Sequence, residues 1–231
     1  MAGEVPSVRG DGYGAVLRIE VVGMVYKSPE YAAFISDQLF DLNARIVGND
    51  PVPAVEPWLD DIYHDPNPSD HYLSRVYRCW NYCVESSEAK YVCLVNSDMA
   101  FSPGWLEALE RRLDGSTLPV SRLVEPGFIR PGQHAIEINL GRDPSQFPFA
   151  SWNAMAADLS EERVVSGGLF MPCILHRETF LRVGGYPHGN VNGVSGDKIL
   201  FDKMSEAGFA HVTCFDSLVY HMQEGEMRHV E

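Results

Sequence analysis

Three polar residues follow an apolar run near the middle of the chain. Residues 90–95 read KYVCLV, and Asn96, Ser97 and Asp98 come directly after them. Such a run predicts a buried strand, and open α/β sheets bind ligands at the carboxyl ends of their strands. A carboxylate at that position can hold Mg²⁺ or Mn²⁺, and the metal can in turn hold a diphosphate. The alternative is that Asn96 and Asp98 form an Asx turn before the next helix.

Two residues further along the chain are candidates for proton transfer and metal binding. Asp197 follows a glycine-rich loop and begins an expected helix, where it could be a general base for a hydroxyl or could cap the helix. His221 follows the last expected strand, where it could ligate a metal or serve a structural role. Glu224 and Glu226 come next and could simply be solvated.

The elements that would position these residues alternate between strand and helix. Apolar, β-rich runs predict strands over 16–26, 43–48, 90–95, 118–123 and 210–220. Apolar spacing and capping residues predict helices over 29–39, 71–88, 103–113, 178–183 and 197–207. The opening strand, helix and strand form a βαβ unit, which implies a parallel sheet. Residues 51–70 and 125–160 are expected to be loops, and the second of these is long enough to face a substrate.

The composition indicates an acidic globular protein. The chain has 231 residues, 45% of them hydrophobic, which suits one α/β domain with a sizeable core. It has 18 Lys and Arg against 32 Asp and Glu, which gives a formal net charge of −14. An acidic chain without a basic run is a poor candidate for binding nucleic acid or an anionic membrane. A small anionic ligand remains compatible, because a divalent metal can bridge two sets of negative charges.

The cysteines and the beginning of the chain bear on its location. There are five cysteines, an odd number without a CxxC motif, so we expect reduced thiols in a cytoplasmic protein rather than a disulfide framework. Residues 1–15 are polar and glycine-rich, which predicts a flexible leader and not a signal peptide. No apolar run approaches 18 residues, so no transmembrane segment is expected.

Taken in order, these motifs resemble a family 2 glycosyltransferase with the GT-A fold. The resemblance covers residues 18–224 and rests on Asn81, Asn96-Ser97-Asp98, Gly167-Gly168, Gly185-Tyr186, Gly196-Asp197, Gly208-Phe209 and His221. It implies an α/β fold: one GT-A-like domain over 16–231, with a Rossmann-like, mostly parallel central sheet and helices on both faces. Residues 16–113 would form the nucleotide-binding half, and residues 114–231 the acceptor half.

The resemblance also implies an activity and a set of site residues. The activity would be inverting transfer of a sugar from a nucleotide sugar, such as a UDP- or GDP-sugar, to a hydroxyl of a glycan, lipid-linked or small-molecule acceptor. Asp98 and His221 would hold Mn²⁺ or Mg²⁺, and Asp197 would be the catalytic base. Contacts to the nucleotide sugar are implied for Val25, Tyr26, Lys27, Asn49, Asp50, Asn81, Asn96, Ser97, Gly167 and Gly168.

Three positions depart from the family pattern and keep other functions open. Trp80 stands where Arg is usual, Asn96 replaces the first Asp of the DxD motif, and Gly196 replaces a Glu. A catalytically inactive GT-A-like binding module is therefore one alternative. A sugar-phosphate nucleotidyltransferase is a weaker one, because residues 23–27 lack the glycine-rich loop usual in that class. If the chain is a transferase, we expect the irregular segment 125–160 to contact the acceptor through Phe147, Phe149 or Trp152.

Overall fold

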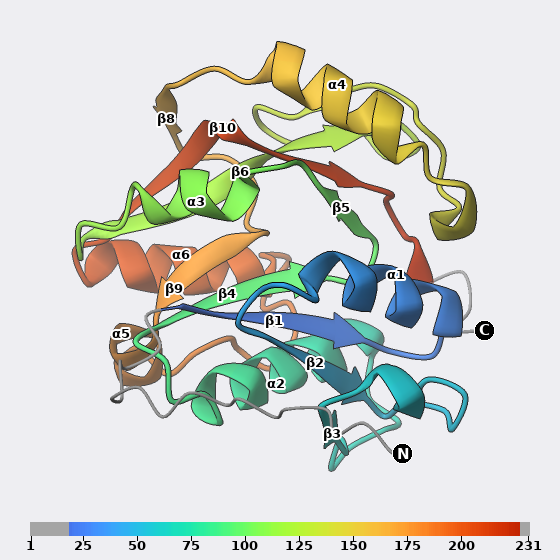
Figure 1. Cartoon of the computed structure of the whole chain (residues 1–231). Helices are drawn as coiled ribbons and strands as arrows, with labels where there is room; N and C mark the ends of the chain where they lie inside the picture. The colour runs from blue at the N-terminus through green and yellow to red at the C-terminus, as the bar shows by residue number, and fades with distance from the viewer. Residues whose placement is uncertain (1–18, 227–231) are drawn as a thin grey trace, which may run out of the picture.

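The computed structural model describes residues 19–226, and the expected leader, residues 1–15, lies outside them. The described residues form a ten-stranded sheet with helices on both of its faces (Figure 1). The strands are β1 (Ile19–Val25), β2 (Ala44–Asn49), β3 (Asp61–Tyr63), β4 (Tyr91–Asn96), β5 (Met99–Phe101), β6 (Thr117–Glu125), β7 (Ile136–Glu137), β8 (Val164–Ser166), β9 (Cys173–His176) and β10 (Ala210–His221). The helices are α1 (Pro29–Leu39), α2 (Tyr72–Glu85), α3 (Trp105–Glu110), α4 (Phe149–Leu159), α5 (Arg177–Arg182) and α6 (Gly196–Glu206), with 3₁₀ turns η1 (Glu56–Trp58) and η2 (Pro144–Gln146).

The strand order explains why one edge of the sheet collects polar residues. The main path is β3-β2-β1-β4-β9-β6-β10-β5, and β1 pairs in parallel with both β2 and β4. Because β9 is antiparallel to both β4 and β6, β6 and its parallel neighbour β10 run in the direction of β4. The carboxyl ends of these strands therefore share one edge. They place Val25, Asn49, Asn96, Glu125 and His221 there. The predicted mostly parallel α/β sheet is confirmed.

The central strands are buried on both faces. Residues 91–95 of β4 and residues 21–25 of β1 are buried, and the two strands pair with Met24 opposite Asn96. Near-continuous apolar sequence is typical of a parallel strand covered by helices on each side. In Figure 1, α1 and α3 lie on one side of these strands and α2 and α6 on the other. This rigid centre fixes the position of Asp98, which follows β4.

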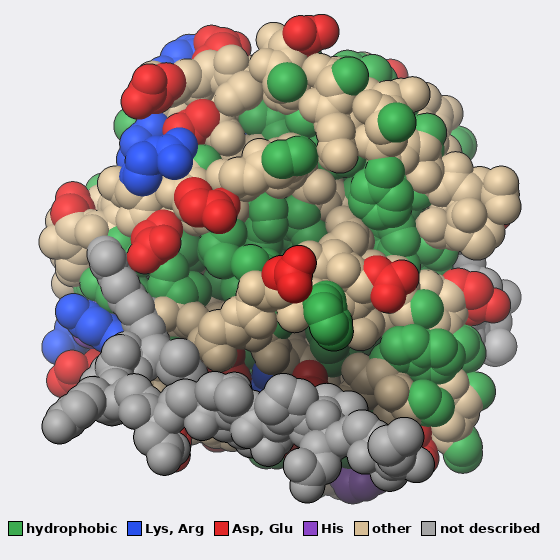
Figure 2. Space-filling view, viewed as in Figure 1, with side chains coloured by type: hydrophobic (Ala, Val, Ile, Leu, Met, Phe, Trp, Pro, Cys, Tyr) green, Lys and Arg blue, Asp and Glu red, His purple; other side chains and the backbone are tan. Residues whose placement is uncertain are grey.

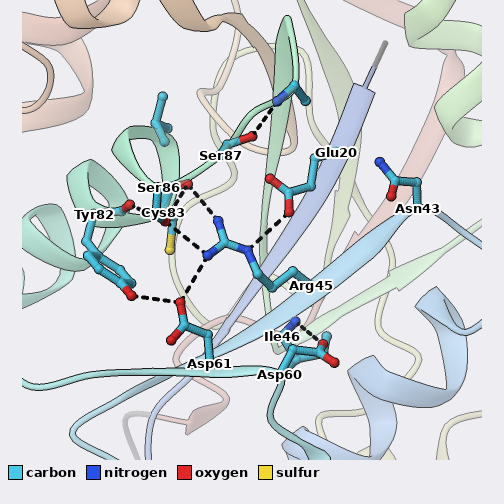
Figure 3. A network of polar contacts seen from close by, with 12 residues as sticks. Glu20, Asn43, Arg45, Ile46, Asp60, Asp61, Tyr82, Cys83, Ser86 and Ser87 are labelled. Atoms are coloured by element: carbon cyan, nitrogen blue, oxygen red, sulfur yellow. Dashed lines mark hydrogen bonds and ion pairs between the residues drawn. The ribbon is translucent and has the colours of Figure 1, made fainter. Parts of the chain in front are cut away.

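A half-buried network around Arg45 fixes the helix α2 against the edge of the sheet (Figure 3). Arg45 of β2 donates to Glu20 Oε1 at 3.1 Å and to Asp61 Oδ2 at 3.0 Å. The same guanidinium donates to the backbone oxygen of Cys83 at 2.9 Å, and Tyr82 donates to Asp61 Oδ2 at 2.8 Å. Planar arginine suits several acceptors at once. The network therefore joins β1, β2 and β3 to the carboxyl-terminal turns of α2, the helix whose other residues face the candidate site.

Two segments expected to be loops contain regular structure. The segment 51–70 holds η1 and the short edge strand β3, which pairs in parallel with β2. The segment 125–160 holds β7, η2 and the helix α4. Of the three aromatic residues expected to contact an acceptor, Phe149 is 37% exposed, whereas Trp152 and Phe147 are buried against Tyr220 of β10. Their aromatic area stabilises a second hydrophobic core and is not available to a ligand.

All five cysteines are buried and free. Within residues 19–226, no helix is both long enough and apolar enough to cross a bilayer.

Figure 2 shows a hollow on the face that carries α1 and α3, with hydrophobic side chains inside it and acidic side chains around it. This groove has a volume of about 290 Å³. It is lined mainly by Asp37, Asp41, Leu42, Phe101, Trp105, Glu107 and Phe149. Among the residues that the sequence predicts to contact a ligand, Phe149 lines this groove, and the predicted catalytic, nucleotide-sugar and metal residues do not.

Candidate active site

A cavity of about 270 Å³ opens at the polar edge of the sheet. Its walls come from α2, from the carboxyl end of β4, from the beginning of α6 and from the segment after β10. Five of the residues predicted from the sequence line it together: Asn96, Ser97, Asp98, Asp197 and His221. Asp98 and Asp197 are 99 positions apart in the sequence, so their common cavity is a product of the fold.

A carboxylate and an imidazole face each other on one wall. The Nε2 atom of His221 lies 3.4 Å from Oδ2 of Asp98, and its Nδ1 lies 3.0 Å from Oε1 of Glu125. An oxygen and a nitrogen at this separation fit two adjacent ligands of Mn²⁺ or Mg²⁺, which commonly complete their shell with phosphate and water. Glu125 would then orient the imidazole through its Nδ1 atom, as carboxylates beside ligating histidines commonly do. No group of three or more His, Cys, Asp or Glu residues within the described chain forms a ready-made metal cage.

The same contacts set the charge of His221. Burial disfavours the imidazolium, but the carboxylates of Asp98 and Glu125 outweigh it and raise the pKa of His221 to about 10. Burial also opposes ionisation of Asp98, yet His221 and the backbone N–H of Gly225 hold the pKa of Asp98 below its ordinary value. The protein without metal therefore carries an ion pair at this wall. Metal binding must release the His221 proton, because only neutral imidazole is a ligand.

The segment after β10 closes over the cavity through Glu226. Its Oε1 accepts from the backbone N–H groups of Tyr26, Lys27 and Ser28 at 2.7, 2.7 and 3.0 Å. Its Oε2 accepts from the Ser97 hydroxyl at 2.7 Å. The expectation that Glu226 is solvated is wrong, because its carboxylate satisfies four donors at the ends of β1 and β4. Glu224, by contrast, has a side chain that is 57% exposed.

Asp197 lines the cavity from the beginning of α6. Ser195 is the N-cap of α6, and its side chain accepts from the N–H of Lys198 at 3.2 Å. Capping is therefore performed by Ser195, and the Asp197 carboxylate is free for another role. Its Oδ2 accepts from the Tyr77 hydroxyl at 2.9 Å. Burial raises the pKa of Asp197, and the Tyr77 hydrogen bond partly counteracts this.

The residues implied to contact the nucleoside lie beside the cavity. Tyr26 packs edge-to-face on Tyr72, a wall residue, with ring centroids 5.6 Å apart. Asp50 accepts from Arg75 at 2.7 Å. Within the described residues, the buried Tyr26 hydroxyl and Asn49 Oδ1 have no hydrogen-bond partner. Buried polar atoms are nearly always paired, so these two mark a place where a polar ligand group fits. Val25 is buried, the Lys27 N–H donates to Glu226, and the Lys27 ammonium lies 5.1 Å from the centroid of the Tyr26 ring.

Three residues of the resemblance are not brought to the cavity. Asn81 donates to the backbone oxygen of Tyr186 at 3.0 Å and accepts from its N–H at 2.8 Å, so both ends of its amide are engaged in holding a loop. Gly167 and Gly168 lie beside β10, where Gly167 O accepts from the Thr213 hydroxyl. A Cβ at Gly168 would collide with that hydroxyl, so this glycine is required by packing against β10.

Sequence reasoning missed Glu125, Glu226, Tyr72 and Tyr77 as site residues. Glu125 ends β6, which runs two residues beyond the predicted strand 118–123, so its place at the edge of the sheet was not apparent from the sequence. The other three depend on contacts between segments that are distant in the sequence. Tyr26 and Glu226, for example, are 200 positions apart.

Comparisons with known proteins give a fold but no family. No protein-family model matches this sequence, and no curated protein matches it. Among solved structures, the chain is similar to a crystal structure of GalNAc-T7 with UDP, GalNAc and Mn²⁺, with a TM-score of 0.57 and 11% sequence identity. The match covers 94% of this chain and 47% of that one, so this chain spans about half the length of that protein. The chain has a GT-A-like α/β fold.

Proposed function

We propose that this protein transfers a sugar from a nucleotide-sugar donor, a UDP- or GDP-sugar, to an acceptor hydroxyl with inversion and with Mn²⁺ or Mg²⁺ as cofactor. The observation that carries the proposal is that Asp98 and Asp197 line one cavity at the carboxyl edge of the sheet. The likeness of the fold to GalNAc-T7, whose structure holds UDP, GalNAc and Mn²⁺, supports the same class of ligand.

The charge of the cavity favours a metal-bound donor. Asp98, Asp197, Glu224 and Glu226 line it, and His221 is the one basic side chain among the lining residues of the described chain. A nucleoside diphosphate alone would meet repulsion from these carboxylates. Bound between Asp98, His221 and the diphosphate, a divalent cation would neutralise the charge that develops on the leaving group. Asp98 and His221 would hold the cation that binds the donor's diphosphate, and Tyr26 and Asn49 would contact its nucleoside.

Asp197 supplies the base that a sugar transfer needs. An alcohol is a weak nucleophile, so removal of its proton during attack accelerates transfer by roughly 10²–10⁴-fold. In this proposal the Asp197 carboxylate accepts that proton while the acceptor oxygen bonds to the anomeric carbon and the bond from that carbon to the diphosphate breaks. Attack from the face opposite the leaving group inverts the configuration, as in the single displacements of inverting glycosidases.

The acceptor is a glycan, a lipid-linked sugar or a small molecule with a free hydroxyl. We also propose a cytoplasmic location, which the five unpaired, buried thiols support.

Binding and turnover measured together test the proposal. We expect UDP or GDP to raise the unfolding temperature only when Mn²⁺ or Mg²⁺ is present, and a panel of nucleotide sugars to yield free nucleoside diphosphate. Metal-dependent nucleotide binding without turnover of any donor would identify a binding module instead. A product that carries a new nucleotide would identify a nucleotidyltransferase.

A further inference from the structure

The hydroxyl of Tyr77 is directed at the proposed base by several packing contacts. Tyr77 comes from α2 and is buried, and its hydroxyl lies 2.9 Å from Oδ2 of Asp197 on α6. Its ring stacks on the ring of Tyr186, with centroids 5.0 Å apart and planes 6° from parallel. Asn81, one turn after Tyr77 on α2, fixes the backbone of Tyr186 through two hydrogen bonds. The ring of Tyr77 is therefore held on one face by a residue that its own helix positions.

Gly196 provides the space that this arrangement needs. A Cβ at position 196 would lie 2.4–2.9 Å from three atoms of the Tyr77 ring, closer than real side chains approach. Any larger residue would displace the ring or α6. The resemblance expects Glu at this position, so the departure from the family pattern has a physical reason. The glycine leaves room for the Tyr77 ring of α2 beside Asp197, the next residue in the sequence.

We propose that Tyr77 is a positioning residue for Asp197: its hydroxyl fixes one carboxylate oxygen and leaves the other to accept the proton of the acceptor hydroxyl. The inference rests on the proposed function. Tyr77 keeps its own proton throughout, because burial and the neighbouring Asp197 raise the pKa of the phenol. A neutral phenol donates to the ionised carboxylate and so keeps Asp197 ionised in a site where burial opposes ionisation.

The other titratable groups near Asp197 do not compete for this role. The Tyr186 phenol and the Cys173 thiol both have pKa values raised by burial and by Asp197, so they are neutral near pH 7. Asp98 and His221 line the same cavity from the sheet side and oppose each other in charge. Among residues 19–226, the Tyr77 hydroxyl is the side-chain group from another element that donates to the Asp197 carboxylate at 2.9 Å, and it also lies 3.5 Å from Oδ1 of Asn190.

The test compares Tyr77→Phe with a matched control on the same helix. Tyr82→Phe also removes a hydroxyl that donates to an aspartate, Asp61, but at the far end of α2 (Figure 3). The carboxyl carbon of Asp197 is followed by NMR as pH is varied in the free protein, and UDP affinity is measured with Mn²⁺. For Tyr77→Phe we expect the pKa of Asp197 to rise by about one, which corresponds to loss of one hydrogen bond to a charged group. UDP affinity stays at the wild-type value, and Tyr82→Phe changes neither quantity.

Turnover separates this inference from the proposed function. With any donor that the wild-type protein consumes, Tyr77→Phe is expected to lower kcat about tenfold at neutral pH and to move the acidic limb of its pH profile upward, with an unchanged donor KM. An unchanged Asp197 titration in Tyr77→Phe would overturn the positioning role. A shifted titration with an unchanged kcat profile would instead overturn Asp197 as the base. If Tyr77→Phe folds poorly, Gly196→Ala moves the ring from the other side and must shift the titration in the same direction.

Discussion

His221 Nε2 lies 3.4 Å from Asp98 Oδ2, although the two residues are 123 positions apart in the sequence. The pair forms because β5, which follows Asp98 directly, pairs antiparallel with β10 and places Met99 opposite His221, while the Met222 N–H donates to the backbone oxygen of Asp98 at 3.0 Å. It brings a carboxylate and an imidazole together at one wall of the cavity. The first prediction concerns Asp98.

Asp98→Asn should abolish metal-dependent nucleotide binding. The substitution removes the anionic oxygen that attracts a hard cation and leaves a weaker amide ligand. Calorimetry with UDP and Mn²⁺ should show at least a tenfold loss of affinity, which corresponds to about 1.4 kcal/mol. Asp114→Asn, at an exposed turn, is the control and should bind as the wild type does. Wild-type affinity in Asp98→Asn would remove Asp98 from the metal site.

Asp197→Asn should separate binding from chemistry. The amide cannot take up a proton, so turnover should fall by roughly 10²–10⁴-fold while UDP affinity with Mn²⁺ is kept. Asp202→Asn is a matched control on the same helix, where Asp202 is paired with Lys198 at the surface. The measurement is release of nucleoside diphosphate from a donor that the wild-type protein consumes. Near wild-type turnover would exclude Asp197 as the base.

His221 should make the stability of the metal-free protein depend on pH. Its pKa is raised from 6.5 to about 10 on folding, so the folded state holds a proton that the unfolded state has lost between these values. The stabilisation is complete below pH 6.5 and is lost as pH rises toward 10, with a slope of up to about 1.4 kcal/mol per pH unit. Urea unfolding with EDTA should show this decline in the wild type and a flatter profile in His221→Gln. His188→Gln, at an exposed position, should retain the wild-type profile.

Glu226→Ala should destabilise the fold. The change leaves three backbone N–H groups and the Ser97 hydroxyl without their acceptor, and an unsatisfied buried donor costs about 1–3 kcal/mol. We expect a loss of at least about 2 kcal/mol in denaturant unfolding, because water can replace only part of what is lost. Glu224→Ala removes a neighbouring, exposed carboxylate and should cost little. Equal stabilities of the two variants would contradict the assignment of Glu226 to this role.

The contact between Gly196 and Tyr77 can be tested by a double-mutant cycle. Gly196→Ala places a methyl group against the Tyr77 ring and should destabilise the protein by about 1–3 kcal/mol. In a Tyr77→Ala background the ring is absent, and the same Gly196→Ala change should be neutral or stabilising, because Ala favours a helix more than Gly. Additive effects in the cycle would show that the two positions do not interact.

Most of this fold can be predicted from the sequence because the main strands are visible as short apolar runs. The runs before Asp98 and before His221 are apolar and end abruptly in polar residues, so their carboxyl ends could be placed without coordinates. Helix α4 was missed because its sequence, FASWNAMAADL, is apolar and small on most sides and shows no clear helical period. Trp152 at its centre was interpreted as a ligand contact for the same reason, whereas it fills a core.

The site could be predicted only in part because some of its residues end a strand or begin a helix, whereas others lie within a helix. Asp98 and Asp197 stand at the ends of elements, and that position is visible in a single sequence. Tyr77 lies within an amphipathic helix, where nothing distinguishes it from the other aromatic residues that pack there. Its role depends on Gly196, and a glycine alone does not indicate which ring will occupy the space beside it.

The hydrogen bonds between Glu226 and the backbone after β1 join positions about 200 residues apart in the chain. Contacts of such separation form late, because the intervening chain must first be ordered. During synthesis, a ribosome must have passed Glu226 and released it from the exit tunnel before the end of β1 can acquire this acceptor. The newly made protein therefore completes its cavity as one of its last folding events, and we expect nucleotide binding to appear only after the whole described chain has been translated.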